Sequence, residues 1–222
     1  ITGGYSQLES TGQVTNSFFI LSENGEWLVP PYHKTILLAF GEYLPGADLI
    51  PGLREQVPQV GDYGRGPGPT VLTAGQVKIG AQICYEGLFD WFSRQQAQNG
   101  AHVLVNLTND AWYGAWQQPY QHLYMTLARA VEVRRPLVRS TNTGISASVL
   151  GSGEILVQSP TSEEWYSVYE VPYAKNPADT LFMTTGAWLV PSILALALVV
   201  VAATFRVRFP DESRQPAGGW RR

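Results

Sequence analysis

Apolar residues alternate with polar or small residues in the middle of the chain. The apolar positions of this segment are Val77, Ile79, Ala81 and Ile83. A period of two residues places all four side chains on one face of a β-strand at 77–83. Another short apolar segment at 71–73 precedes it, with Ala74-Gly75-Gln76 between the two. We therefore predict two strands joined by a tight turn.

Helical and extended patterns follow one another along the rest of the chain. Apolar positions three or four residues apart predict helices at 88–99 and 118–134, ended by Gly100 and Pro136. Short apolar runs between turn residues predict strands at 101–107, 137–140, 145–150, 155–158 and 165–171. Near the N-terminus, 16–21 and 27–29 predict a hairpin with an Asn24-Gly25 turn. This alternation is typical of an α/β fold.

An uncharged, almost wholly apolar stretch covers 188–205. As a helix it would be roughly 27 Å long, close to the hydrocarbon thickness of a bilayer. Its polar side chains, Ser192 and Thr204, can bond to helix carbonyls, and Pro191 is expected in the first turn, where it costs little. A buried core helix is the alternative, but no face of this stretch is polar. We predict a transmembrane helix at 188–205.

Charges on either side of this helix predict its orientation. Arginines follow it at positions 206, 208, 214, 221 and 222, whereas the nearest preceding cation is Lys175. Basic residues favour the cytoplasmic side. We expect an extracytoplasmic domain at 1–173, a connector at 174–187 and a cytoplasmic tail at 206–222.

Composition excludes several classes of function. The chain has 222 residues, 45% of them hydrophobic, which is enough for one sizeable core. A net charge of -3 without a basic run in the globular part gives little support for nucleic-acid binding. The three histidines and one cysteine do not have the spacing of metal ligands, which disfavours a metal site. The sequence also lacks the glycine-rich loop before a helix that would indicate a phosphate-containing cofactor.

The single cysteine, Cys84, directly follows the predicted strand at 77–83. A lone cysteine is often just a small buried hydrophobe. At the end of a strand, however, it can be held rigidly as a nucleophile. Three further segments have the polar and glycine-rich character of active-site loops, at 32–45, 106–114 and 139–147. We therefore favour the nucleophile hypothesis.

Motifs in these segments resemble a known family. They are Tyr32-x-Lys34, Phe40-Gly41-Glu42-Tyr43-x-Pro45, Cys84-Tyr85-Glu86, Asn109-Asp110-x-Trp112-Tyr113-Gly114 and Arg139-x-Thr141-Asn142-x-Gly144. Their order over 16–153, with a hydrophobic tail, resembles the apolipoprotein N-acyltransferase family of the nitrilase (carbon-nitrogen hydrolase) superfamily. The resemblance implies a four-layer α-β-β-α sandwich, incomplete here at its N-terminus, followed by one transmembrane helix.

The resemblance also implies roles for individual residues. Cys84 corresponds to a nucleophile that forms an acyl thioester, and Lys34 to the cation that stabilises the oxyanion. Glu42 corresponds to a glutamate that supports the catalytic group. The alternative to these two roles is that Lys34 is a solvated surface lysine and Glu42 a carboxylate in a loop. Glu86 is expected to hold the lysine or position the incoming amine, and Tyr85 to shape the acyl pocket.

Other polar and aromatic residues are assigned supporting roles. We expect Asn109-Asp110 and Asn142 to bond the local backbone. The aromatic cluster Trp112, Tyr113 and Trp116 is either part of a core or a lipid-facing lid. His122 is the rival base of a Cys-His mechanism, although a lone histidine on an apolar helix is more often structural.

Two features depart from the family pattern. The base glutamate normally lies well upstream of the lysine, and Glu9, Glu23 and Glu26 are unsuitable, since they lie in a polar lead-in or a turn. Ala39 and Ala187 replace a proline and an aspartate. Because the chain opens at Ile1 without a methionine or signal peptide, we expect a C-terminal fragment. Because the base glutamate is missing from it, we expect this fragment to be inactive alone.

The leading functional hypothesis is transfer of a fatty acyl group from a phospholipid to the N-terminal amine of a diacylglyceryl-cysteine lipoprotein. The full-length enzyme would be a multi-pass protein of the bacterial inner membrane. The alternative is a nitrilase-type amidohydrolase acting on a small amide, against which the membrane helix argues. A third class is an inactive domain that only binds lipoproteins.

Overall fold

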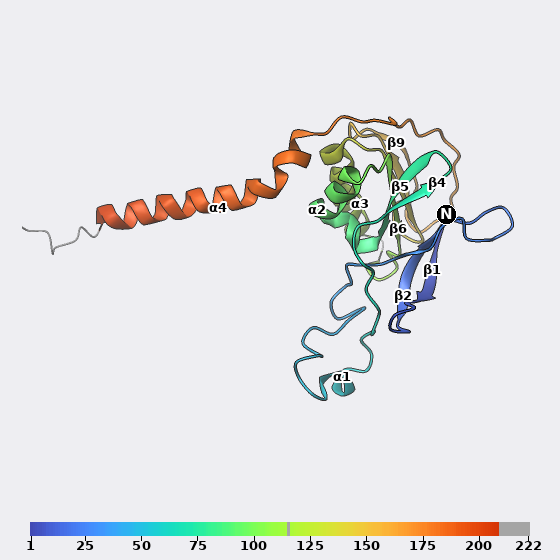
Figure 1. The fold of residues 1–222 in the computed structure, drawn as a ribbon, viewed down its shortest axis with the longest axis horizontal. Helices are drawn as coiled ribbons and strands as arrows, with labels where there is room; N and C mark the ends of the chain where they lie inside the picture. Colours follow the sequence, from blue (N-terminus) through green and yellow to red (C-terminus); the bar gives the residue numbers. More distant parts are fainter. Residues whose placement is uncertain (115, 209–222) are drawn as a thin grey trace, which may run out of the picture. The chain divides into compact units, whose positions relative to one another are not determined.

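The computed structural model describes residues 1–114 and 116–208, with side chains described up to residue 205. Two compact units divide the chain, at 1–183 and 184–222. The first unit contains two β-sheets and a layer of helices, and the second contains most of one long helix (Figure 1). Residues 209–222 of the predicted cytoplasmic tail lie outside the described residues.

A six-stranded mixed sheet forms the centre of the first unit. Its strands follow chain order: β4 (Val71–Ala74), β5 (Val77–Ile83), β6 (Val103–Thr108), β7 (Leu137–Thr141), β8 (Ala147–Val149) and β9 (Ile155–Gln158). Strands β5, β6 and β7 are parallel, whereas β4, β8 and β9 pair antiparallel with their neighbours. The α/β prediction and the predicted bounds of β5 are confirmed.

A second sheet of three antiparallel strands contains β1 (Thr2–Gln7), β2 (Val14–Phe19) and β3 (Tyr32–His33). The chain turns back after β2 as predicted, with an antiparallel bridge between Leu21 and Trp27 and a backbone hydrogen bond from the Leu28 N–H to the Ile20 carbonyl, but 27–29 forms no strand. The prolines at positions 30 and 31 lack the N–H groups that a longer strand there would need. The strands that pair with β2 are instead β3 and β1, and the two glycines of β1 weaken its strand signal.

Helices cover one face of the six-stranded sheet (Figure 1). They are a short 3₁₀ helix, η1 (Cys84–Leu88), followed by α2 (Asp90–Gln98) and α3 (Gln118–Val133). The first predicted helix therefore begins later than expected, because the η1 turn occupies 84–88. Helix α3 ends where Arg134 adopts a left-handed conformation. A single helical turn, α1 (Leu53–Gln56), lies in the loop after β3.

The two faces of β5 contact different layers. Ile79 and Ala81 belong to a buried cluster with Phe18 of β2 and Tyr32 of β3. Gln82 faces the other way and donates to Ser93 and Gln96 of α2 at 2.8 and 2.9 Å. The period of two residues thus produces three layers, namely helices, the six-stranded sheet and the three-stranded sheet. A second helical layer on the outer sheet is not present among the described residues of 1–183, where β1 is largely exposed.

The final predicted strand and the apolar helix differ from expectation in detail. Residues 165–171 form no strand, and Tyr166 and Val168 are more than nine-tenths exposed. No described strand pairs with this segment, and strand formation depends on such a tertiary partner. Helix α4 (Leu181–Arg208) starts within the predicted connector, so Pro191 lies inside the helix rather than in its first turn. The hydroxyl of Thr204 donates to the Val201 carbonyl at 2.7 Å, as predicted.

Helix α4 alone among the described residues is long and apolar enough to cross a membrane. The candidate span is 25 residues, Leu181–Phe205, with a mean hydropathy of 2.4. Met183, near the start of the helix, is buried, but the apolar window on which this assignment rests contains no buried residue. A soluble core helix would be mostly buried, so the exposure of α4 favours a bilayer as its surroundings.

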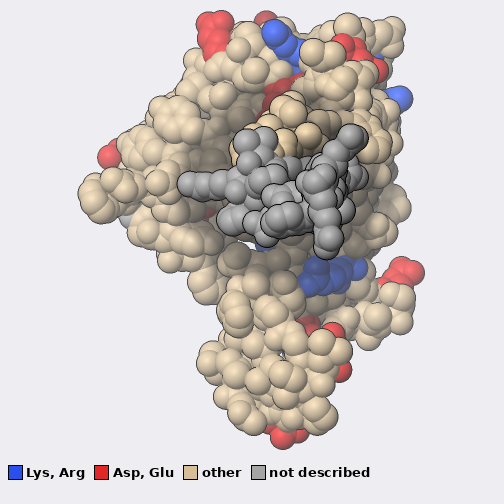
Figure 2. Space-filling view, turned by 90° about the vertical axis from the view of Figure 1, so that its left-hand side faces the viewer, with Lys and Arg blue, Asp and Glu red and all other residues tan. Residues whose placement is uncertain are grey.

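Several charged residues of the first unit are buried. On the face shown in Figure 2, charged side chains appear as separate spots among neutral atoms. Lys34, Glu86, Asp110 and Arg139 are at most 2% exposed. Burying a charge is costly unless it is paired, so such a group is a reason to look for a functional site.

Candidate active site

A small pocket of about 140 Å³ lies next to Cys84. Strand β5 delivers Cys84 at its carboxyl end, the segment after β3 delivers Lys34 and Glu42, and the loop after β6 delivers Asn109 and Tyr113. The remaining lining residues are Tyr5, Asn16, Leu38, Gly41, Tyr63, Ile83 and Trp112. The three predicted residues Cys84, Lys34 and Glu42 therefore share one pocket.

Cys84 has an unusual backbone conformation. Its φ angle is 52°, in the left-handed region, where a residue with a Cβ atom is strained by about 1–2 kcal/mol. It is both the residue after β5 and the first residue of η1. Gly87 allows the turn to lie close to its neighbours, because a Cβ atom there would be 2.9 Å from Thr126 and 3.0 Å from Asn106. The chain thus makes a sharp strand-to-helix turn at its only cysteine.

Lys34 is a buried cation with fixed partners. Its side chain is 2% exposed, and Nζ donates to both carboxylate oxygens of Glu42 at 2.8 Å. Glu42 also accepts the Leu38 N–H at 2.7 Å and the Asn16 amide at 2.6 Å. These contacts contradict the alternatives of a solvated surface lysine and a free loop carboxylate. The ammonium group is held at the wall of the pocket that contains the thiol.

The surroundings of Cys84 favour the neutral thiol. Burial raises the pKa of the Cys84 thiol above its ordinary value, the charge of Lys34 lowers it, and the carboxylates of Asp110 and Glu42 raise it again. The net shift is upward, so the thiol needs a base to become a thiolate near neutral pH. Glu42 is the one carboxylate lining this pocket among the described residues, and its oxygens already accept four hydrogen bonds.

Glu86 is placed differently from the prediction. It is fully buried and accepts the Tyr32 hydroxyl at 2.6 Å and the backbone N–H groups of Thr35, Ile36 and Ile83 at 2.6, 3.1 and 2.7 Å. Burial raises the pKa of Glu86 to about 7, while these donors act in the opposite direction. Glu86 does not contact the Lys34 ammonium or line the pocket. It connects the backbone beside Lys34 to the backbone beside Cys84.

Tyr85 and the aromatic loop also depart from expectation. Tyr85 does not line the pocket but contacts Phe89 edge-on, with ring centroids 5.2 Å apart. Trp112 and Trp116 are 74% and 81% exposed, so this cluster is not part of a core. Trp112 and Tyr113 nevertheless line the Cys84 pocket. Trp112 and Tyr113 are thus exposed to solvent on one side and face the Cys84 pocket on the other, as residues of a lid over this pocket would.

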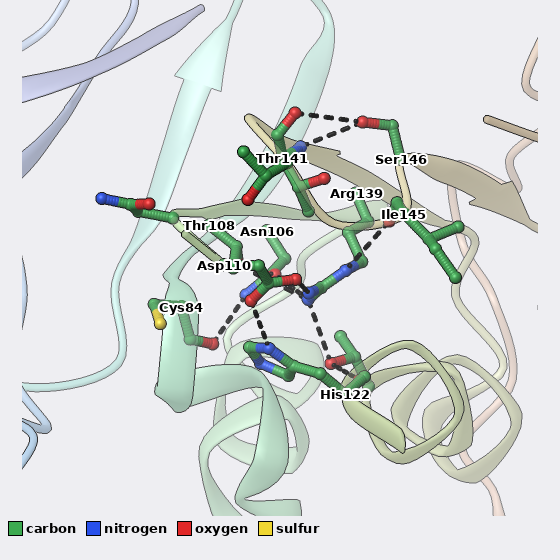
Figure 3. A network of polar contacts seen from close by, with 12 residues as sticks. Cys84, Asn106, Thr108, Asp110, His122, Arg139, Thr141, Ile145 and Ser146 are labelled. Atoms are coloured by element: carbon green, nitrogen blue, oxygen red, sulfur yellow. Dashed lines mark hydrogen bonds and ion pairs between the residues drawn. The ribbon is translucent and has the colours of Figure 1, made fainter. Parts of the chain in front are cut away.

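The asparagines of the loops after β6 and β7 bond locally, as predicted. The Asn142 side chain accepts the Asp110 N–H at 3.0 Å and donates to Asn109 at 2.7 Å. Asp110, however, uses its carboxylate for two side chains, Arg139 at 2.9 Å and His122 at 2.8 Å (Figure 3). His122 thus bonds Asp110, and no hydrogen bond to Cys84 occurs.

The sequence did not predict that Asn106 and Arg139 belong to the buried polar network around Asp110. Asn106 and Arg139 are register partners on the parallel strands β6 and β7, so their side chains share the face covered by helices. The sequence signal that could have identified them is a polar residue directly after the apolar residues of a strand, Asn106 in β6 and Arg139 in β7. No cluster of three or more His, Cys, Asp and Glu side chains in the described part of the chain is arranged to hold a metal.

Comparisons with known proteins place this geometry in a family. The family model described as Carbon-nitrogen hydrolase matches residues 1–175. Similar chains include an apolipoprotein N-acyltransferase of Bdellovibrio bacteriovorus, 46% identical over 94% of this chain and 40% of the relative. One from Geobacter metallireducens is 38% identical over 86% of this chain and 36% of the relative. This chain spans about 40% or less of the length of these relatives.

Solved structures agree on the fold. Saccharomyces cerevisiae Nit3, a member of branch 10 of the nitrilase superfamily, matches with a TM-score of 0.54 and 17% identity. The match covers 73% of this chain and 55% of Nit3. A nitrilase-like fold is therefore shown by structure, and the family model covers most of the chain. The chain belongs to the carbon-nitrogen hydrolase family.

Proposed function

We propose that the chain is the C-terminal part of a membrane enzyme that transfers a fatty acyl group to the N-terminal amine of a lipoprotein. One observation carries the proposal: the only cysteine and a buried, carboxylate-paired lysine lie in the same pocket. A fixed ammonium group next to a thiol suits a reaction in which negative charge develops on an acyl oxygen. The apolar helix α4 supports a lipid substrate.

The reaction proceeds in two steps. The Cys84 sulfur attacks the ester carbonyl of a phospholipid, the carbon–oxygen bond breaks, and the lysophospholipid alkoxide takes up the proton that the thiol gave to a base. The amine of the lipoprotein then attacks the thioester, the carbon–sulfur bond breaks, and the thiol is regenerated as the amine loses its proton. Lys34 stabilises the oxyanion in both steps. The base is a glutamate upstream of Ile1, while Glu42 orients the lysine.

The relatives support a substrate class for the proposed reaction. Proteins named apolipoprotein N-acyltransferase are similar over most of this chain. These names support an apolipoprotein as acceptor, and we propose further that it carries a diacylglyceryl-cysteine and that a phospholipid is the donor. The full-length protein would have several transmembrane helices in the bacterial inner membrane, with the catalytic domain on the periplasmic side and the C-terminus in the cytoplasm. The exposed Trp112 and Trp116 would form a lipid-facing lid.

A direct product assay tests the proposal. Full-length protein in phospholipid vesicles should convert a diacylglyceryl lipopeptide to its N-acylated form, and Cys84→Ala should abolish the product. Release of ammonia from simple amides without N-acylation would overturn the proposal in favour of an amidohydrolase. Neither product from the folded wild-type protein would indicate an inactive binding domain.

A further inference from the structure

A chain of buried polar contacts runs from α3 to the backbone of Cys84 (Figure 3). His122 Nδ1 lies 2.8 Å from Asp110 Oδ1, and Arg139 Nη2 donates to Asp110 Oδ2 at 2.9 Å. Arg139 Nη1 donates to Asn106 Oδ1 at 2.7 Å, and Asn106 Nδ2 donates to the Cys84 carbonyl at 3.1 Å. All four linking side chains are at most 4% exposed. No step of the proposed reaction uses them.

The contact chain has a fixed direction. The guanidinium of Arg139 can only donate hydrogen bonds, so it requires the carbonyl oxygen of the Asn106 amide. The NH₂ group of Asn106 must then face the Cys84 carbonyl, which can only accept. A reversed amide would break both contacts and leave buried groups unpaired, at about 1–3 kcal/mol each. Arg139 therefore determines the orientation of the group that binds the cysteine backbone.

Asp110 makes this position of Arg139 tolerable. An unpaired buried guanidinium would be strongly destabilising, and Asp110 is its one carboxylate partner among the described residues. Although burial acts to raise it, the hydrogen bond from His122 and the charge of Arg139 lower the pKa of Asp110, so the carboxylate is ionised. Gly144 leaves room for it, because a Cβ atom there would overlap the Asp110 carboxylate.

We propose that Asp110 is a positioning residue for Cys84, acting through Arg139 and Asn106 to fix the carbonyl of Cys84 and thereby its left-handed conformation. The inference rests on the proposed role of Cys84 as nucleophile. On the other side of the turn, the Glu86 carboxylate accepts the N–H of Ile83. The strained residue is thus fixed by hydrogen bonds on both sides, which is what a non-glycine residue with positive φ requires.

Two substitutions distinguish the effect of the Cys84 backbone position from the effect of the charge near its thiol. Asn106→Ser removes the contact with the Cys84 carbonyl and leaves the Asp110–Arg139 ion pair in place. Asp110→Asn leaves the Arg139 cation unpaired in the same low-dielectric region as the thiol, which favours the thiolate. Glu132→Gln is a matched control, because Glu132 pairs with Arg129 at 2.6 Å on α3 and neither residue bonds Asn106, Asp110 or Arg139; the nearest contact to the cysteine turn is from Arg129 to the Leu88 carbonyl, at the far end of η1.

The readouts are acyl-transfer kinetics of the full-length protein and the pH dependence of Cys84 alkylation, followed by mass spectrometry of the Cys84 peptide. Charged and titratable groups around the thiol are Lys34, Glu42, Glu86, Asp110, Tyr113, His122 and Arg139. Asn106→Ser should lower kcat at least about tenfold with KM within about twofold. Asp110→Asn should lower the alkylation midpoint by about one pH unit. Glu132→Gln should change neither.

Wild-type kcat in Asn106→Ser overturns the proposal, and this variant decides alone if Asp110→Asn does not fold. An unchanged alkylation midpoint in folded Asp110→Asn also overturns it, because the network would then not reach the thiol. Failure of the proposed function is distinguishable. If Cys84→Ala retains acyl transfer, Cys84 is not the nucleophile, whereas the alkylation data still report whether Asp110 acts on the thiol.

Discussion

The carboxylate of Glu86 accepts the backbone N–H of Thr35 at 2.6 Å, although 51 positions separate the two residues. Thr35 follows Lys34, and Glu86 lies two residues after Cys84. The same carboxylate also accepts the N–H of Ile83, the residue before Cys84. Glu86 therefore sets the position of the lysine-bearing segment relative to the cysteine turn without entering the pocket.

Replacing Glu86 by glutamine should change how stability depends on pH. The folded-state pKa of Glu86 is raised from its ordinary 4.5 to about 7, so the folded protein keeps a proton that the unfolded chain has lost between these values. Stability of the wild type therefore falls as pH rises through this window, by about 3 kcal/mol for this group. Glu86→Gln lacks this titration.

Urea unfolding of both proteins in detergent at pH 4.5 and pH 7.5 measures the effect. The wild-type free energy of unfolding, minus that of Glu86→Gln, should be larger at the lower pH. The titrations of all other groups are common to the two proteins and cancel. Parallel stability profiles would show that Glu86 does not titrate between these pH values.

Removal of the Lys34 charge should weaken catalysis and suppress the thiolate. Lys34 lowers the pKa of Cys84, so Lys34→Gln should shift the alkylation midpoint to higher pH. Loss of the oxyanion donor should lower kcat by about 10²–10³-fold. Lys78→Gln is the matched control, since Lys78 is an exposed lysine on β5, the strand that precedes Cys84. Equal effects in the two variants would contradict the role assigned to Lys34.

Much of the sheet could be predicted because its strands have clear patterns. Strand β5 has a strict apolar alternation, and its bounds are as predicted. Strand β1 contains Gly3 and Gly4, which carry no side chain to form a pattern, so its pairing with β2 was missed. The segment 165–171 has strand-forming residues but no partner strand in the structure. Strand pairing depends on tertiary neighbours that a local pattern does not contain.

Sequence motifs predicted several residues of the pocket, but not the residues whose role depends on side-chain contacts in the folded chain. Cys84, Lys34 and Glu42 were identified from motifs and share one pocket. The position of Glu86 was not predicted, because the side chain of a residue two positions after Cys84 in a sharp turn can point either into the pocket or into the core. The Asn106–Arg139 contact depends on the register of two parallel strands, which only the three-dimensional structure provides.

The charges around α4 predict a defined topology. A reporter that is active only in the cytoplasm should function when fused after Arg222, because basic residues follow the apolar span. A membrane-impermeant thiol reagent should reach Cys84 only from the periplasmic side. Fusion of the reporter to an extracytoplasmic loop of the same full-length protein is the control. A C-terminus outside the cytoplasm would contradict the proposed localisation.

Residues 1–222 expressed alone should show no detectable acyl transfer. The carboxylate of Glu42 is engaged by Lys34, Leu38 and Asn16, and no other described carboxylate lines the pocket. Members of a catalytic group act together, so loss of the base leaves little activity. The exposed strand β1 should also promote aggregation. A folded, active chain would make Glu42 the next candidate for the base.

The acyl-enzyme is the most direct test of the account. Full-length protein incubated with a phospholipid carrying a labelled acyl chain, without an amine acceptor, is quenched in acid and digested. The peptide containing Cys84 should carry the acyl mass, lose it in neutral hydroxylamine, and pass it to a lipopeptide amine added before the quench. Labelling or acyl transfer that persists in Cys84→Ala would contradict the central claim that Cys84 forms the thioester.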